Sequence, residues 1–135
     1  MTSELVDFSL NIEEAKIFDK GAPLKNSLRL EGKKWQAINA TAGDCHVSFI
    51  FIVYSDGHAT FEAVTWTDFT HSKDVFNIWI TVLDTQGVPV FGFGPWDSPP
   101  MDSPPAGGYY NWSKVGYFPP DLYAKTASAT FGGRC

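Results

Sequence analysis

The chain has 135 residues, of which 44% are hydrophobic and 16% aromatic, and its formal net charge is −5. This length predicts one globular domain over residues 1–135, large enough to bury a core. The negative charge and the lack of a basic patch exclude nucleic acids and anionic membranes as partners, because both attract clustered lysine and arginine. Aromatic residues, nine prolines and twelve glycines favour an all-β chain with many turns.

The first strand is predicted at residues 5–12, where apolar and polar residues alternate. Asn11 and Glu14 could also open a short helix that ends at Gly21. Residues 28–37 favour one or two short strands, interrupted at Gly32.

The strongest strand pattern follows Cys45. An apolar run at 46–54, an Asp-Gly turn and a second run at 59–66 predict a hairpin. Further strands are expected at 74–84, 88–93, 110–118 and 124–131, and the first of these places Phe76, Ile78, Ile80 and Val82 on one face. Consecutive strands joined by turns predict an antiparallel meander of about eight strands. We expect a small β-barrel, with a β-sandwich as the alternative.

Asp-Ser-Pro-Pro occurs twice in tandem, at 97–100 and 102–105. Proline excludes this stretch from helices and sheet interiors, and a long loop inside a compact domain is usually functional or disordered. Aromatic and methionine side chains in and beside the loop indicate that it folds over another part of the domain.

The candidate acid–base groups are His71, in the loop before residues 74–84, and two carboxylates of the Pro-rich loop, Asp97 and Asp102. The carboxylates could instead cap their own turns, and His71 could bond its backbone neighbours. We expect His46 at a sheet edge or in the core, and His58 in solvent. The chain has no motif for a cofactor, a phosphate or a metal ion, so none is expected.

The candidate ligand contacts are aromatic or soft apolar side chains: Trp66, Trp96, Met101, Tyr109, Tyr110 and Trp112. If enclosed, they would form a pocket for an apolar organic molecule, and the protein would be a cofactor-independent cyclase or isomerase with His71, Asp97 and Asp102 as its catalytic groups. If exposed, they would form a stacking surface for a glycan, as in a lectin. In a structural or interaction module they would only pack a core, which we expect of Trp79.

The order of the strands also predicts where the candidate groups lie. In an antiparallel hairpin, the start of one strand and the end of the next fall at the same edge of the sheet. His71 is therefore expected beside the loop that runs from Trp96 to Trp112.

The first seven residues lack the basic start and apolar run of a secretion signal, and no apolar run approaches the length of a membrane span. We therefore expect a cytoplasmic protein. In a reducing compartment Cys45 and Cys135 would be free thiols, although a disulfide would pin the chain end. The residues themselves leave both states open.

Short motifs resemble a known family. They are Ala42-Gly43-Asp44-Cys45, Thr70-His71-Ser72-Lys73-Asp74, Trp96-Asp97-Ser98-Pro99 with Met101-Asp102, Tyr110-Asn111-Trp112-Ser113, and the final Cys135. Over roughly residues 35–135 the chain resembles small bacterial and fungal proteins that share a domain of unknown function. The resemblance implies an all-β domain and a paired Cys45–Cys135, and it implies no activity.

Overall fold

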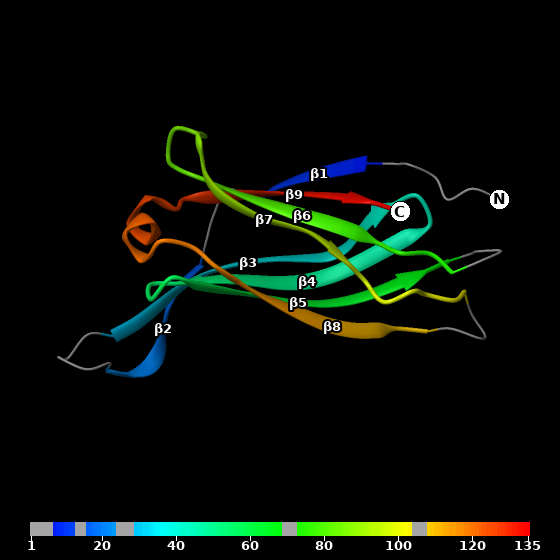
Figure 1. The fold of residues 1–135 in the computed structure, drawn as a ribbon, viewed down its shortest axis with the longest axis horizontal. Helices are drawn as coiled ribbons and strands as arrows, with labels where there is room; N and C mark the ends of the chain where they lie inside the picture. The colour runs from blue at the N-terminus through cyan, green and yellow to red at the C-terminus, as the bar shows by residue number, and fades with distance from the viewer. Residues whose placement is uncertain (1–6, 13–15, 24–28, 69–72, 104–107) are drawn as a thin grey trace.

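The computed structural model describes residues 7–12, 16–23, 29–68, 73–103 and 108–135 (Figure 1). Within these residues the elements are β1 (Asp7–Ile12), β2 (Lys16–Pro23), β3 (Arg29–Ala42), β4 (Cys45–Tyr54), β5 (His58–Thr67), β6 (Asn77–Leu83), β7 (Pro89–Asp97), β8 (Tyr110–Tyr117), the 3-10 helix η2 (Pro120–Lys125) and β9 (Ser128–Arg134). The all-β prediction is confirmed. No helix in the described part of the chain is long and apolar enough to cross a membrane.

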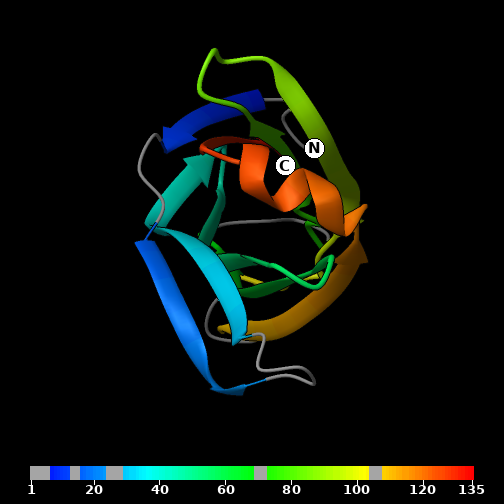
Figure 2. The ribbon, with the colours of Figure 1, turned by 90° about the vertical axis from the view of Figure 1, so that its left-hand side faces the viewer.

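The strands form two antiparallel sheets, ordered β1-β9-β6-β7 and β2-β3-β4-β5-β8. The sheets face each other as two layers, and η2 covers one end of the space between them (Figures 1 and 2). No described strand pairs with the opposite sheet, so neither sheet closes on itself. The barrel prediction is therefore wrong, and the β-sandwich is confirmed.

The chain follows a simple meander only from β2 to β5, and it changes sheet after β1, β5, β7 and β8. Two of these crossings contain the three proline pairs of the sequence, at 99–100, 104–105 and 119–120. Proline lacks the N–H that would continue a ladder, so it favours the end of a strand. In the predicted single meander, tight turns within one sheet would have stood in place of these crossings between sheets.

Two predictions near the N-terminus are wrong. Residues 16–20, the span of the possible helix, begin β2, and β3 continues through Gly32 for 14 residues. Gly32 pairs with Phe18 on one side and Tyr54 on the other. Backbone pairing on both sides outweighs the weak tendency of a glycine to interrupt a strand, because strand propensity depends on tertiary context.

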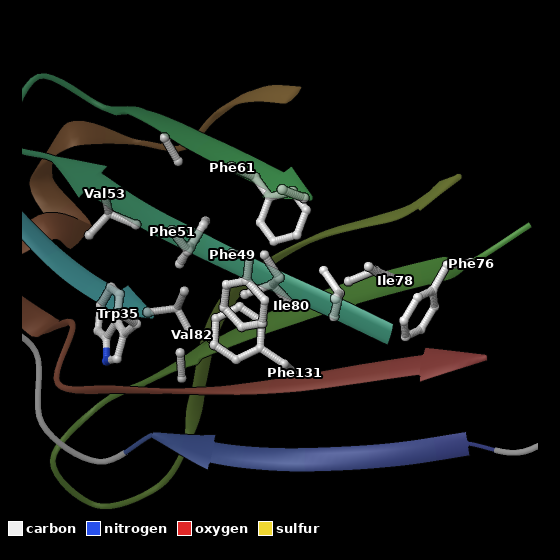
Figure 3. Packing of buried hydrophobic residues seen from close by; sticks show 14 of the residues in the cluster. Trp35, Phe49, Phe51, Val53, Phe61, Phe76, Ile78, Ile80, Val82 and Phe131 are labelled. Atoms are coloured by element: carbon white, nitrogen blue, oxygen red, sulfur yellow. The ribbon is translucent and has the colours of Figure 1, made fainter. Parts of the chain in front are cut away.

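Aromatic and aliphatic side chains fill the space between the sheets (Figure 3). Phe131 of β9 packs on Phe49 and Phe51 of β4, with ring centroids 4.3 and 5.8 Å apart. The side chains of Phe76, Ile78, Ile80 and Val82 all point inward, as their alternation predicted. A close-packed interior of this kind leaves little room for a ligand between the layers.

Trp79 lies on the opposite face of β6, so the prediction of core packing is wrong for this residue. Its indole covers Gly132, where an added Cβ would lie 2.1 Å from the Trp79 Nε1 atom. The guanidinium of Arg134 lies 6.0 Å from the same ring. Because side chains alternate along a strand, the residue between two core positions must face outward.

A disulfide joins Cys45, at the start of β4, to Cys135, after the end of β9. It links one sheet to the other, because β4 and β9 belong to different layers. The pairing implied by the family resemblance is confirmed, and the expectation of free thiols is wrong. Both cysteines are buried at the same end of the core, where the two sulfur atoms meet.

Candidate functional site

The two loops that were predicted to meet do meet at one end of the sandwich. Asp74 and Met101 form a backbone bridge, with N–H to O distances of 3.0 and 2.8 Å. The Lys73 amine donates to Asp102 Oδ2 at 2.9 Å. His71 itself lies outside the described residues, so its place beside the Pro-rich loop stays a prediction.

The two candidate carboxylates accept hydrogen bonds from other segments of the chain. Asp97 accepts a hydrogen bond from the Asn77 amide across β6 and β7, at 2.6 Å. Asp102 accepts from Lys73, and this hydrogen bond and the negative charge raise the pKa of the Lys73 amine. The Asp102 N–H donates to the Tyr110 hydroxyl at 3.1 Å. These contacts hold the loop in place.

Four of the candidate ligand contacts pack in or against the core: Trp96, Met101, Tyr110 and Trp112. Met101 is fully buried, so the Pro-rich loop does fold over the end of the sandwich. Trp96 and Trp112 pack on Phe61, at centroid distances of 5.4 and 5.5 Å. The Trp112 indole donates to the buried Thr65 hydroxyl at 3.0 Å.

The other two aromatic candidates lie together on the outer face of the five-stranded sheet. The Trp66 indole stacks on the His46 imidazole, at 5.3 Å and an interplanar angle of 12°. The Tyr109 ring meets Trp66 edge-on at 5.2 Å, and Tyr109 is 73% exposed. We call His46, Trp66 and Tyr109 the aromatic platform.

Hydrogen bonds fix the imidazole of His46 within this platform. His46 Nε2 lies 2.6 Å from Asp68 Oδ2, and Nδ1 lies 3.0 Å from both Asn39 Oδ1 and Thr41 Oγ1. Asn39 sits in a bulge of β3 with a φ of 56°, a conformation that asparagine tolerates better than most residues. The bulge directs Asn39 toward His46, which therefore holds Trp66 in a defined orientation.

A groove of about 680 Å³ crosses the same outer face. Its lining comprises three consecutive residues from each of four neighbouring strands: Gln36, Ala37, Ile38, Ser48, Phe49, Ile50, Glu62, Ala63, Val64, Asn111, Trp112 and Ser113. The middle residues form one cross-strand line, because Ala37 pairs with Phe49, Phe49 with Ala63, and Ala63 with Trp112.

The side chains of that middle line point into the core, so the floor of the groove is backbone and its walls are the flanking residues. One wall is the cross-strand row Gln36, Ile50, Glu62 and Ser113, and the other is Ile38, Ser48, Val64 and Asn111. The first wall has Ile50 as its one apolar residue, whereas apolar and polar side chains alternate along the second wall. The lining has one carboxylate and neither histidine nor cysteine, which argues against a metal site in the groove.

Sequence reasoning identified only part of this face. Trp66 and Tyr109 were predicted as ligand contacts, whereas Gln36, Ser48, Asn111 and Ser113 were missed. The alternation of β4 and β5 could have placed Ser48 and Glu62 on the outer face. The groove itself depends on the pairing register of four strands, which the alternation of single strands does not give.

A model described as a family of unknown function (DUF6294) matches residues 50–135. The chain therefore belongs to this family, and the predicted membership of a family of unknown function is confirmed. The matched region contains the motifs at 70–74 and 96–102, while the motif at 42–45 precedes it. Neither the curated proteins nor the solved structures contain a match to the chain.

Proposed function

We propose that this member of DUF6294 is a carbohydrate-binding protein that holds a neutral glycan in the groove of the five-stranded sheet. The observation that carries the proposal is the groove beside an exposed aromatic platform on one sheet face. Four strands at about 4.8 Å spacing make the groove about 14 Å long, more than one sugar ring requires.

The groove walls carry groups that complement those of a sugar. Glycan hydroxyls can donate to the Glu62 carboxylate and exchange hydrogen bonds with the side chains of Gln36 and Asn111. The apolar side chains of Ile50 and Val64 lie between these polar groups and can contact the C–H faces of a sugar ring. This mixture favours an amphipathic ligand over a wholly apolar one.

The aromatic platform extends the site at one end. Trp66 follows Val64 by two residues on β5, so both side chains project from the same face. Tyr109 is exposed, and aromatic rings that stand free of the core are the groups on which sugar rings stack. His46 keeps the Trp66 ring from turning.

The charge of the groove lining selects against anionic ligands. Glu62 is the only ionisable side chain among the lining residues, and Asp68 lies at the platform end. A sulfated or phosphorylated ligand would meet negative charge on both. The net charge of −5 acts in the same direction.

The cyclase or isomerase hypothesis required an enclosed aromatic pocket. Trp96, Met101 and Trp112 instead pack with the core, and the described carboxylates are held by Asn77 and Lys73. An enzyme that acts on a small organic substrate stays a prediction. The cytoplasmic location also stays a prediction, and the disulfide is more typical of an oxidising compartment.

The test is a neutral-glycan array, followed by affinity measurements on the glycan bound best. Glu62→Ala removes the only charged hydrogen-bond acceptor of the groove and should weaken binding at least about tenfold, the value of one charge-assisted hydrogen bond. Tyr109→Ala should weaken it about three- to tenfold through lost stacking. Tyr117→Ala is the matched control, because Tyr117 is 79% exposed at the far end of β8.

Two results would count against the proposal. One is an array on which the folded protein binds no neutral glycan. The other is binding that Glu62→Ala and Tyr109→Ala leave at the wild-type level.

A further inference from the structure

A carboxyl group lies against the disulfide that joins the two sheets. The Sγ atoms of Cys45 and Cys135 and a carboxylate oxygen of Asp74 all lie within 4.8 Å of one another. The three residues are buried, and they come from the start of β4, the segment before β6 and the position after β9. The fold therefore gathers three ligand-type groups from distant parts of the chain.

These groups are of the kinds that bind zinc. Zn²⁺ takes cysteine thiolates, histidine nitrogens and carboxylate oxygens, and sites with three protein ligands complete the tetrahedron with a water molecule. In the oxidised protein the two sulfur atoms bond to each other and are not thiolates. We propose that reduction of Cys45–Cys135 turns this cluster into a zinc site, with both thiolates and Asp74 as ligands.

The conversion is a balanced two-electron step. A dithiol reductant attacks the disulfide, the Sγ–Sγ bond breaks, and the reductant becomes a disulfide as its two electrons and two protons pass to the cysteines. Zinc then binds both sulfur atoms as thiolates and releases the two thiol protons to solvent. No oxidant or further reactant is required.

Electrostatics and the surrounding contacts support a cation at this place. Two thiolates and a carboxylate in a buried position would repel one another, and a divalent ion compensates their charge. Thr67 Oγ1 donates to Asp74 Oδ2 at 2.7 Å, and Thr67 pairs with Cys45 across β4 and β5. Hydrogen bonds of this kind orient a carboxylate ligand toward its metal.

The site would keep the sheets linked in both redox states. In the oxidised chain the link is the Sγ–Sγ bond, and in the reduced chain it is the ion held between β4 and the end of β9. The Pro-rich loop would stay anchored in both, because Asp74 pairs with Met101 through backbone atoms.

The experiment uses the full chain reduced with a phosphine, then titrated with ZnCl₂ or with CoCl₂ as a spectroscopic probe. We expect one ion per reduced chain, a thiolate-to-cobalt charge-transfer band and no binding to the oxidised chain. ZnCl₂ should also raise the melting temperature of the reduced protein, because a ligand of the native state stabilises it. A reduced chain that binds no zinc, or that stays unfolded with zinc present, overturns the proposal.

Variants identify the ligands. Asp74→Asn should weaken zinc binding at least tenfold, Cys45→Ser with Cys135→Ser should abolish the charge-transfer band, and Asp121→Asn, an exposed acid in η2, should change neither. Wild-type affinity in Asp74→Asn would overturn the assignment of Asp74. If Asp74→Asn does not fold, X-ray absorption of the reduced zinc protein decides: two sulfur ligands with lighter atoms support the site, and lighter atoms alone overturn it.

Discussion

Lys33 of β3 and Tyr123 of η2 form a pair of buried polar residues where the helix meets the sheet. The Lys33 amine donates to Tyr123 O, Thr126 O and Thr126 Oγ1 at 3.0, 2.8 and 2.8 Å, and it lies 4.5 Å from the centre of the Tyr123 ring. Burial lowers the pKa of Lys33, and the charge of Glu31 partly opposes this. The amine thus ties β3 to the helix that closes one end of the sandwich.

Tyr123→Phe should reduce the loss of stability at alkaline pH. The Tyr123 hydroxyl is buried with no hydrogen-bond partner among the residues that the structure describes, and burial raises the pKa of this phenol from 10.0 to about 12. In the unfolded chain the phenol ionises near pH 10, so the stability it contributes is complete below pH 10 and is lost as the pH rises to about 12. Phenylalanine cannot ionise, so the variant lacks this loss.

At pH 7 the same variant should be at least as stable as the wild type, because it removes an unsatisfied buried hydroxyl that costs about 1–3 kcal/mol. Urea unfolding from pH 7 to pH 11.5 measures both effects, with the exposed Tyr117→Phe as the control. Lys33 also makes the free energy of unfolding depend on pH: because its pKa is lowered in the folded protein, stability rises toward pH 10.5. This contribution is the same in the wild type and in Tyr123→Phe. A variant that is less stable at pH 7, with an unchanged alkaline slope, would contradict the interpretation.

At the scale of elements, contacts of Ser98 and Met101 hold the described part of the crossing from β7 to β8 in place. The Ser98 N–H donates to Phe76 O, and the Phe76 N–H donates to Ser98 Oγ, both at 2.9 Å. Met101 then enters the core. The first Asp-Ser-Pro-Pro repeat therefore fastens the loop through the residues around its prolines.

Met101→Ala should destabilise the protein by about 2–5 kcal/mol, the usual cost of emptying a fully buried methionine site. Val88→Ala, at an exposed position beside the β6–β7 turn, should change stability by less than about 0.5 kcal/mol. Chemical denaturation of both variants checks the contrast. Equal and small effects would show that the loop is not anchored through Met101.

At the scale of the whole molecule, the disulfide holds the two layers together at one end and η2 covers the other (Figure 1). Cys45→Ser with Cys135→Ser should lower stability by about 2–5 kcal/mol, since the bridge spans 90 residues and restricts the unfolded chain. The corresponding fall in melting temperature is roughly 6–20 °C.

Thiol titration of the unfolded, unreduced wild type provides the direct check on the bridge. We expect no free thiol, and two free thiols would show that the bridge is absent. The melting temperature of the double variant then measures how much the sheets depend on the link.

Much of the fold followed from local patterns. Alternation placed Ile78, Ile80 and Val82 of β6, and Phe76 just before it, on one buried face, because side chains alternate along a strand and one face of the sheet is removed from water. The antiparallel hairpin rule brought residues 73–74 to residues 101–102. The same local reasoning was wrong for the possible helix over residues 16–20, where pairing with β3 decided the structure.

The sequence by itself determined the all-β class, most strand positions and a Pro-rich loop that packs on the domain, because each depends on period, turn chemistry or proline geometry. Only the tertiary structure decided between barrel and sandwich, since the four changes of sheet are set by long-range pairing. It also decided the groove, whose walls need Gln36, Ile50, Glu62 and Ser113 in register across four strands. A shift of one residue would turn these side chains to the other face, and no single strand carries that information.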